Sequence, residues 1–197
     1  PFGLIANDPR HLGGAIDGEG GEKGARFLQL CDVYGLPVVS LCDTPGFMVG
    51  PESEKTAAVR RGSRLILASA NLRVPLFTVV VRKAYGLGAQ AMAGGGLHEP
   101  FFSVAWPTAE LGPMGLEGAV ELGFRKELDA VPDGPERRAL YEKLVAQMYD
   151  KGKGISVAQA FELDAVIDPA DTRRWLLAGL RSTSAVERPL RPFVDVW

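Results

Sequence analysis

The stretch from Pro75 to Met92 constrains the fold more than any other part of the sequence. It opens with a short run of β-branched and aromatic residues, which is typical of a buried strand. It closes with a segment that contains Ala and Gln, which favour helix. The tetrapeptide Tyr-Gly-Leu-Gly at positions 85–88 separates the two parts. The pattern therefore predicts a strand, a tight turn and a helix in succession.

The turn at 85–88 has the chemistry of an anion site or an oxyanion hole. Small residues let backbone N–H groups approach a ligand closely. The N–H groups at a helix start have no intrahelical acceptor, and they lie at the positive end of the helix dipole. Both features favour a bound anion or a developing oxyanion. A purely conformational role for these glycines stays open as the alternative at this point.

A second loop of this kind follows an earlier strand. Residues 38–42 are a continuous apolar run, typical of a buried parallel strand, and Asp-Thr-Pro-Gly-Phe follows at 43–47. Open α/β sheets bind their ligands at the carboxyl ends of the strands. We therefore expect the loop at 43–47 at the ligand-binding edge of the sheet.

The rest of the chain alternates between strand and helix patterns, which predicts an α/β architecture with crossover connections. Residues 13–24 are rich in glycine but do not match GxxxxGK[ST], so we expect a structural loop there. The most charged segment, 126–153, is predicted to be an amphipathic helix that packs on the domain or on a partner. The other predicted elements are strands at 2–6, 101–106 and 165–167 and helices at 23–33, 55–70, 115–123, 156–161 and 171–181.

Composition excludes several classes of function. A chain of 197 residues that is 46% hydrophobic is expected to form one domain or a large part of one. Its net charge of −2, with both signs interspersed, argues against nucleic-acid binding. No apolar stretch is long enough to span a membrane, so we expect a soluble, cytoplasmic protein without a membrane partner. The start at Pro1, directly in an apolar run, suggests a domain fragment.

The sequence motifs give little support to catalysis by side chains or to metal binding. There is no G-x-S-x-G motif, and His11 and His98 are the only candidates for the general base of a triad. His98 lacks the HExxH pattern of a metal site, and as a lone histidine without a paired nucleophile we expect it to be a turn or interface residue. Cys31 and Cys42 have no CxxC spacing, which predicts reduced core cysteines and no metal site.

A dinucleotide site is the main rival interpretation. Gly86-x-Gly88-x-x-Ala91 formally matches G-x-G-x-x-G/A, with Glu110 near the offset of a ribose-binding acid. Against it, residues 82–85 are expected to separate the strand from the glycines. The remaining interpretation is a site built from main-chain amides. Such a site suits reactions through an enolate, where each fixed donor contributes on the order of 3–4 kcal/mol.

Linked motifs along nearly the whole chain resemble the carboxyltransferase β subunit of biotin-dependent acyl-CoA carboxylases, in order and in spacing. The resemblance is specific because it rests on several motifs together. They are FGLIAN at 2–7, KGARF at 23–27, CD at 31–32, DTPGF at 43–47, RKAYG at 82–86, AWPTAE at 105–110, MGxxGAV at 114–120, and IDP with TR at 167–169 and 172–173.

This resemblance implies a crotonase-like α/β fold, a spiral of ββα units. It makes residues 1–181 the carboxyl-terminal subdomain of a carboxyltransferase, followed by a tail at 182–197. Members of the family move a carboxyl group from carboxybiotin to the α-carbon of an acyl-CoA through an acyl enolate. The biotin belongs to a separate carrier protein or domain, and acyl-CoA is the substrate.

The resemblance also implies a division of the active site. This chain would hold the ureido oxygen of biotin on the amides of Leu87 and Gly88, while the other half would hold the thioester oxygen and most of the CoA. Many members have Tyr-Gly-Gly-Ala-Tyr-Asp where this chain has Tyr-Gly-Leu-Gly-Ala-Gln at 85–90. Propionyl-type members share an acid at the position of Gln90, which argues against a propionyl preference. The other residues implied to lie against biotin are Gly86, Ala89, Thr44, Pro45, Gly46 and Phe47.

The implied partners are the amino-terminal half of the carboxyltransferase, a biotin carboxylase and a biotin carrier component. In the family the site forms where the amino half of one subunit meets the carboxyl half of another, within a homo-oligomer. We therefore expect this chain to be inactive alone. A biotin-dependent acyl-CoA decarboxylase subunit, which needs a sodium-pumping membrane partner, stays an alternative with the same fold.

Overall fold

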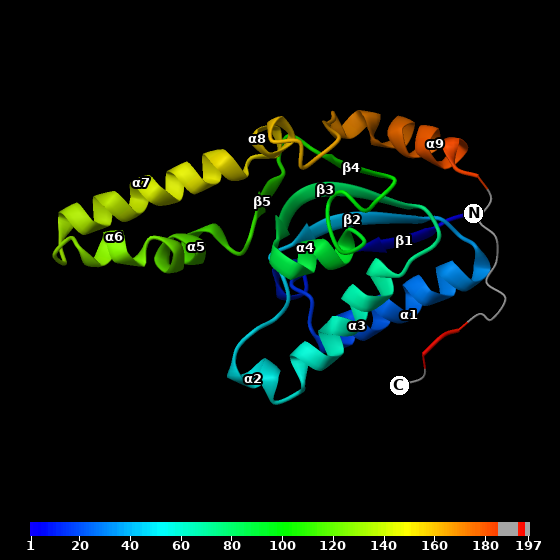
Figure 1. The fold of residues 1–197 in the computed structure, drawn as a ribbon, viewed down its shortest axis with the longest axis horizontal. Helices are drawn as coiled ribbons and strands as arrows, with labels where there is room; N and C mark the ends of the chain where they lie inside the picture. The colour runs from blue at the N-terminus through cyan, green and yellow to red at the C-terminus, as the bar shows by residue number, and fades with distance from the viewer. Residues whose placement is uncertain (185–192, 196–197) are drawn as a thin grey trace.

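Strands rich in β-branched residues form one parallel sheet of six strands (Figure 1). The computed structural model describes residues 1–184 and 193–195. The strand order is β1-β2-β3-β4-β6, and β5 pairs with the last residues of β3, beyond the part that pairs with β4. The strands are β1 (Gly3–Ala6), β2 (Val38–Thr44), β3 (Leu76–Tyr85), β4 (Phe102–Ala105), β5 (Glu110–Gly112) and β6 (Ala165–Val166).

Helices cover both faces of this sheet (Figure 1). Three of them, α1, α3 and α4, pack on one face, and α9 packs on the other. A separate arm made of α5, α6 and α7 projects away from the sheet, beyond β5. The helices are α1 (Gly18–Tyr34), α2 (Pro51–Glu54), α3 (Ala58–Ala70), α4 (Gly86–Met92), α5 (Leu116–Gly123), α6 (Arg125–Asp129), α7 (Pro135–Gly152), α8 (Gly154–Gln159) and α9 (Thr172–Ser182), with short 3-10 turns at Leu12–Gly14 and Pro169–Asp171.

The two central strands are buried on both faces, which explains their continuous apolar sequence. Val39 and Phe77 pack on the side of α9, together with Trp175. Val38 and Val80 belong to the cluster beneath α1, α3 and α4. Because this core holds β2 and β3 side by side, it also fixes where their carboxyl ends lie.

The prediction of a loop over residues 13–24 was wrong in its second half, because α1 begins within it. Asp17 caps this helix: its Oδ1 accepts a hydrogen bond from the amide of Gly20 at 2.7 Å. A glycine at position 21 lets α1 approach α3, since a Cβ added to Gly21 would lie 3.0 Å from the Cα of Gly62. This glycine therefore serves the packing of two helices.

The helix predicted over residues 55–70 forms, but it begins at Ala58 instead of residue 55. Ala57 has a φ of 58°, in the left-handed region, which does not continue a helix. Consequently α3 begins only at Ala58, and the acidic segment before it forms the separate helix α2. The residues at the break include neither glycine nor proline, so local propensity did not reveal it.

The charged segment 126–153 does not form one amphipathic helix. It contributes to α6 and to α7, with Pro-Asp-Gly at 132–134 between them. Helix α7, which carries the predicted apolar stripe, packs against α5 and α6, which makes the arm a two-layered helical unit. The side chains of this stripe are only half-buried: Leu140, Tyr141, Leu144 and Met148.

The remaining predicted strands and short helices are confirmed to within two residues at each end. The helix predicted at 23–33 forms part of α1. β5 was missed, because three residues are too few for a recognisable alternation. Cys31 in α1 and Cys42 in β2 are free and buried, as expected. Most of the predicted tail, 185–192 and 196–197, lies outside the described residues. In the part of the chain that the structure describes, no helix could span a membrane.

Candidate functional site

The structure brings the two predicted loops into contact at the carboxyl edge of the sheet. β2 ends at Thr44, and β3 passes directly into α4. A Cβ added to Gly88 would lie 2.7 Å from the Cα of Gly46 and 3.2 Å from the amide nitrogen of Phe47. Because these neighbours are backbone atoms, only glycine fits at position 88 without a backbone shift. The segments 44–47 and 86–89 thus form one contiguous site.

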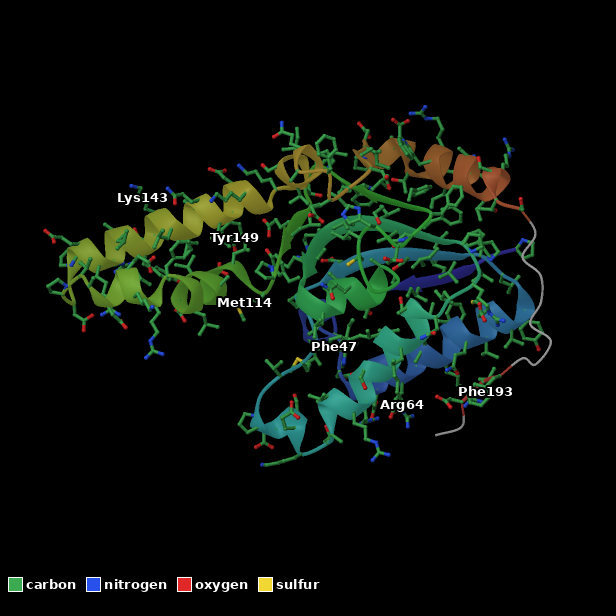
Figure 2. The ribbon with its side chains drawn as sticks, viewed as in Figure 1. Phe47, Arg64, Met114, Lys143, Tyr149 and Phe193 are labelled. Carbon is green, nitrogen blue, oxygen red and sulfur yellow. The ribbon has the colours of Figure 1, made fainter. Side chains whose placement is uncertain are left out.

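A third loop reaches the same turn from β5. Gly86 has a φ of +57°, and a Cβ added there would lie 2.8 Å from the carbonyl oxygen of Pro113. Glycine is therefore required both by conformation and by the close approach. Figure 2 shows Phe47 below the start of α4 and Met114 to its left, at the base of the arm. The loops after β2 and β5 flank the turn.

The start of α4 offers backbone donors. Its N-cap residue, Tyr85, has extended backbone angles, and its side chain makes no capping hydrogen bond. The first amides of a helix have no intrahelical acceptor, so a ligand can accept from them. Leu87 is 60% exposed, whereas Gly88 and Ala89 are buried against the neighbouring loop. The turn can therefore present N–H groups to an oxygen atom.

The loop after β2 is held rigidly. The hydroxyl of Thr44 donates to the carbonyl oxygen of Gly46 and accepts from its amide, both at 3.1 Å. The Gly46 carbonyl also accepts from the amide of Ile16 at 3.0 Å, and the amide of Met48 donates to the Ile16 carbonyl at 2.8 Å. These bonds preorganise the loop that supports Gly88, and a preorganised site has less to reorder during a reaction.

An ion pair that sequence reasoning missed lies at the same edge. Asp43, at the end of β2, accepts from the Arg82 Nε at 3.1 Å and from the amide of Lys83 at 3.2 Å. The Asp43 amide donates to Oδ1 of Asn7 at 3.0 Å, which links the end of β1 as well. A carboxylate just after one strand, with an arginine late in the next, was the available signal. The register shift after Cys42 that aligns the pair was not visible in the sequence.

Tyr85 is held as a neutral phenol. Its hydroxyl donates to Oε2 of Glu110 at 3.0 Å. Burial, followed by this hydrogen bond to a carboxylate, raises the pKa of Tyr85 well above its usual range. The side chain therefore orients β3 and β5 at the site and is not suited to act as a base near neutral pH.

The histidines form pairs with carboxylates. The Nε2 of His11 lies 3.0 Å from Oδ2 of Asp17, and that of His98, a turn residue as expected, lies 3.2 Å from Oε2 of Glu162. Among the described residues, no serine or cysteine hydrogen-bonds to either ring, and no three potential metal ligands cluster. The arrangement offers amides rather than a side-chain nucleophile.

The gap expected between the strand and the glycines, which counted against a dinucleotide site, does not exist. Residues 82–85 do not separate the strand from the glycines, because β3 extends through Tyr85 to the turn. Glu110, the expected ribose-binding acid, is instead bonded to Tyr85. The geometry of the turn alone does not choose between an amide hole and a phosphate-binding turn, so the choice comes from the comparison with known proteins.

Residues 1–192 match the family described as Carboxyl transferase domain. The chain therefore belongs to the carboxyl transferase domain family, as the sequence motifs indicated. A propionyl-CoA carboxylase carboxyltransferase subunit from Haloferax mediterranei is 40% identical over 180 residues, which cover 91% of this chain and 34% of the relative. Further relatives are described as subunits of biotin-dependent acyl-CoA carboxylases. The chain thus spans about a third of the length of these curated relatives.

Solved structures of carboxyltransferases share the fold. The transcarboxylase 12S hexamer, with methylmalonyl-CoA bound, has a TM-score of 0.85 at 34% identity, over 98% of this chain and 37% of that chain. A single-chain, multi-domain long-chain acyl-CoA carboxylase has a TM-score of 0.78 at 55% identity, over 90% of this chain and 17% of that chain. The predicted crotonase-like α/β fold is therefore confirmed.

Proposed function

We propose that this chain is the biotin-side half of a carboxyltransferase, which transfers a carboxyl group from carboxybiotin to the α-carbon of an acyl-CoA. The observation that carries this proposal is the turn at 86–88, which lies against the loop at 44–47 at the carboxyl edge of a carboxyl transferase fold. Membership of the family supports carboxyl transfer over dinucleotide chemistry for the same glycine turn.

The donor set of the turn fits a ureido oxygen. That oxygen accepts hydrogen bonds, and the uncapped start of α4 supplies N–H donors, for which we propose the amides of Leu87 and Gly88. Carboxybiotin, when bound, supplies the activated carboxyl group. The backbone at Gly86 and Ala89 positions the two donors, and the loop at 44–47 supports them from behind. Fixed amide donors stabilise negative charge without reorganising, on the order of 3–4 kcal/mol each.

The ion pair between Asp43 and Arg82 has a positioning role in this proposal. Its carboxylate holds the amide of Lys83 and the guanidinium together, just before β3 reaches the turn. It therefore fixes the last residues of the strand that delivers the donors. The hydrogen bond from Tyr85 to Glu110 fixes the end of β3 to β5 in the same way.

We propose that residues 1–181 act as the carboxyl-terminal subdomain and that residues 182–197 are a tail. The complete enzyme would need the amino-terminal carboxyltransferase half for the thioester, a biotin carboxylase, a biotin carrier and assembly into a homo-oligomer. The short span relative to the curated relatives supports the need for a second half. The hexameric transcarboxylase 12S supports oligomeric assembly.

The test is carboxyl transfer by the complete enzyme, reconstituted with a biotinylated carrier and supplied with acetyl-, propionyl- and longer acyl-CoAs. Gly88→Pro removes one amide donor, and Gly88→Ala is its matched control, because it adds a Cβ but keeps the N–H. Leu87→Pro and Leu87→Ala repeat the comparison at an exposed side chain. We expect each proline variant to lose about 10²–10³ in kcat relative to its alanine control, with assembly intact.

Equal rates for the proline and alanine variants would place the amide hole elsewhere. Transfer to none of the acyl-CoAs by the wild-type enzyme would overturn the proposed function itself. The acyl-CoA that is turned over fastest identifies the substrate.

A further inference from the structure

The arm meets the sheet around β5 (Figure 1). A Cβ added to Gly152, at the end of α7, would lie 2.6 Å from the carbonyl oxygen of Leu111 and 3.4 Å from Cδ1 of Leu116. Leu116 is the first residue of α5, and its side chain is buried. The beginning and the end of the arm therefore close on the strand that precedes the loop at 113–115.

The loop at 113–115 links this contact to the start of α4. The carbonyl oxygen of Pro113 lies 2.8 Å from the position that a Cβ on Gly86 would occupy. Gly86 is the first residue of α4, and Leu87 follows it directly. Because closely packed backbone atoms transmit strain, a displacement of the start of α5 would be passed to the turn at 86–88.

Two phenol–carboxylate pairs lie at this contact. The hydroxyl of Tyr149, near the end of α7, donates to Oε1 of Glu117, in the first turn of α5, at 2.7 Å. The hydroxyl of Tyr85 donates to Oε2 of Glu110 at 3.0 Å. In Figure 2, Tyr149 lies beneath α7 and above Met114, at the end of the arm nearest the sheet. The first pair fixes α7 to α5, and the second fixes β3 to β5.

The two pairs also interact electrostatically. Burial is the main cause that raises the pKa of Tyr85, and the charges of Glu110 and Glu117 both add to it. The hydrogen bond to Glu117 is the main cause that raises the pKa of Tyr149, and the charge of Glu110 adds to it. The same hydrogen bond, with a smaller contribution from the Lys83 ammonium, lowers the pKa of Glu117. Two carboxylates therefore share this region, and without the donor from Tyr149 their repulsion is less well compensated.

We propose that Tyr149 is a positioning residue for carboxyl transfer. Its hydrogen bond to Glu117 holds the start of α5, and with it the loop at 113–115, against Gly86 and the amide donors. The proposal rests on the proposed function, because Tyr149 acts through the donors of the turn. The arm thereby contributes to the geometry of the site.

The first measurement is steady-state carboxyl transfer by the complete enzyme, reconstituted with a biotinylated carrier and carrying Tyr149→Phe. Loss of the hydroxyl should lower kcat by about ten-fold and leave the KM for the acyl-CoA within about two-fold, because displaced donors weaken an interaction made mainly in the transition state. Tyr141→Phe is the matched control. Tyr141 lies about two turns earlier in α7, and among the described residues its hydroxyl has no hydrogen-bond partner. We expect this control to keep the wild-type kcat.

Further variants separate positioning from a loss of stability. Glu117→Leu removes the acceptor and should reproduce the effect of Tyr149→Phe. Glu117→Gln keeps a side-chain oxygen that can accept the hydrogen bond, so it should retain most of the rate. Leu144→Ala truncates a half-buried side chain of α7 outside this pair and should leave kcat unchanged. Native mass spectrometry checks that each variant assembles as the wild type does.

Amide hydrogen exchange on the complete enzyme measures the turn directly. A peptide spanning residues 85–92 should exchange at least about three-fold faster in Tyr149→Phe than in the wild type, because its backbone opens more easily when the neighbouring loop is less firmly held. The same peptide should exchange at the wild-type rate in Tyr141→Phe.

Equal kcat values for Tyr149→Phe and Tyr141→Phe would overturn the positioning role and leave the proposed function standing. An equal loss of kcat in Leu144→Ala, or unchanged exchange of residues 85–92 in Tyr149→Phe, would also overturn it. A wild-type enzyme that transfers no carboxyl group would instead reject the proposed function. The exchange measurement would then still decide whether Tyr149 holds the turn.

Discussion

The start of α4 and the arm differ in how their side chains are packed. Around the turn, Gly88 lies against the backbone of Gly46, and the strands beneath it are buried on both faces. In the arm, α5 and α6 bury three apolar side chains, and α7 buries only Gly152. Added Cβ atoms at Gly118 and Gly123 would meet nothing within 4 Å.

This difference in packing indicates different roles for the turn and the arm. The turn is held by close backbone neighbours from the loops after β2 and β5, as the proposed amide site would require. The arm derives little stability from its own half-buried stripe, because most helical stability comes from packing of an apolar face. We therefore expect equivalent substitutions to have large effects around the sheet and small effects in the arm.

The largest effect is expected in the core. Phe77→Ala removes a fully buried ring that lies 5.1 Å from the ring of Phe102. It should lower the free energy of unfolding by about 3–5 kcal/mol, since the lost transfer energy and the cavity add. Leu144→Ala, at a half-buried position in α7, should cost only about 1 kcal/mol. Denaturant titrations measure both, and similar losses would contradict the contrast.

Paired glycine substitutions sharpen the comparison. Gly88→Ala places a Cβ 2.7 Å from the Cα of Gly46, so the backbone must shift, at a cost of about 1–3 kcal/mol. Gly118→Ala, inside α5 with open space around it, should instead stabilise the chain by about 0.5–1 kcal/mol. Thermal unfolding of both variants gives the sign. A stabilised Gly88→Ala would show that the two loops are not in close contact.

We expect an ion pair at the sheet to contribute more to the free energy of unfolding than an ion pair in the arm. Asp43→Asn weakens the bond to Arg82 at a carboxylate that is 13% exposed, and we expect a loss of about 1–2 kcal/mol. Glu142→Gln breaks the exposed pair with Arg138 in α7 and should cost no more than about 0.5 kcal/mol. Unfolding at low and at high salt distinguishes them. The comparison fails if the arm pair proves the stronger.

A pH-dependent effect of at most about 1 kcal/mol concerns a phenol in the arm. The hydroxyl of Tyr149 donates to Oε1 of Glu117 at 2.7 Å, and this bond, with partial burial, raises the pKa of Tyr149 to about 12. Because the folded-state pKa lies above the unfolded value of about 10, the stabilisation is complete below pH 10. It is lost as the pH rises from about 10 to 12. Tyr149→Phe should cost no more than about 1 kcal/mol at neutral pH.

Thermal melts of the wild type and of Tyr149→Phe between pH 8 and pH 12 follow this difference. The two curves should converge at the alkaline end. A difference that grows with pH would mean that Glu117 does not hold the neutral phenol.

Several features of the fold could be predicted because they depend on local periodicity. The strand, turn and helix over 75–92 and the buried strand before the loop at 43–47 follow from runs of β-branched residues and from glycines. The break at Ala57 and the helix start inside residues 13–24 could not be predicted. The close approach that explains Gly21 needs its partner Gly62, which lies far along the chain.

By itself the sequence determined the α/β class, the family and the two glycine-bearing loops, because these depend on residue types at fixed spacings. Only the tertiary structure decided that Gly46 touches Gly88 and that Asp43 pairs with Arg82. Each of these depends on the register between strands that are distant in the chain. That register is set by the packing of the whole core, and no local pattern carries it.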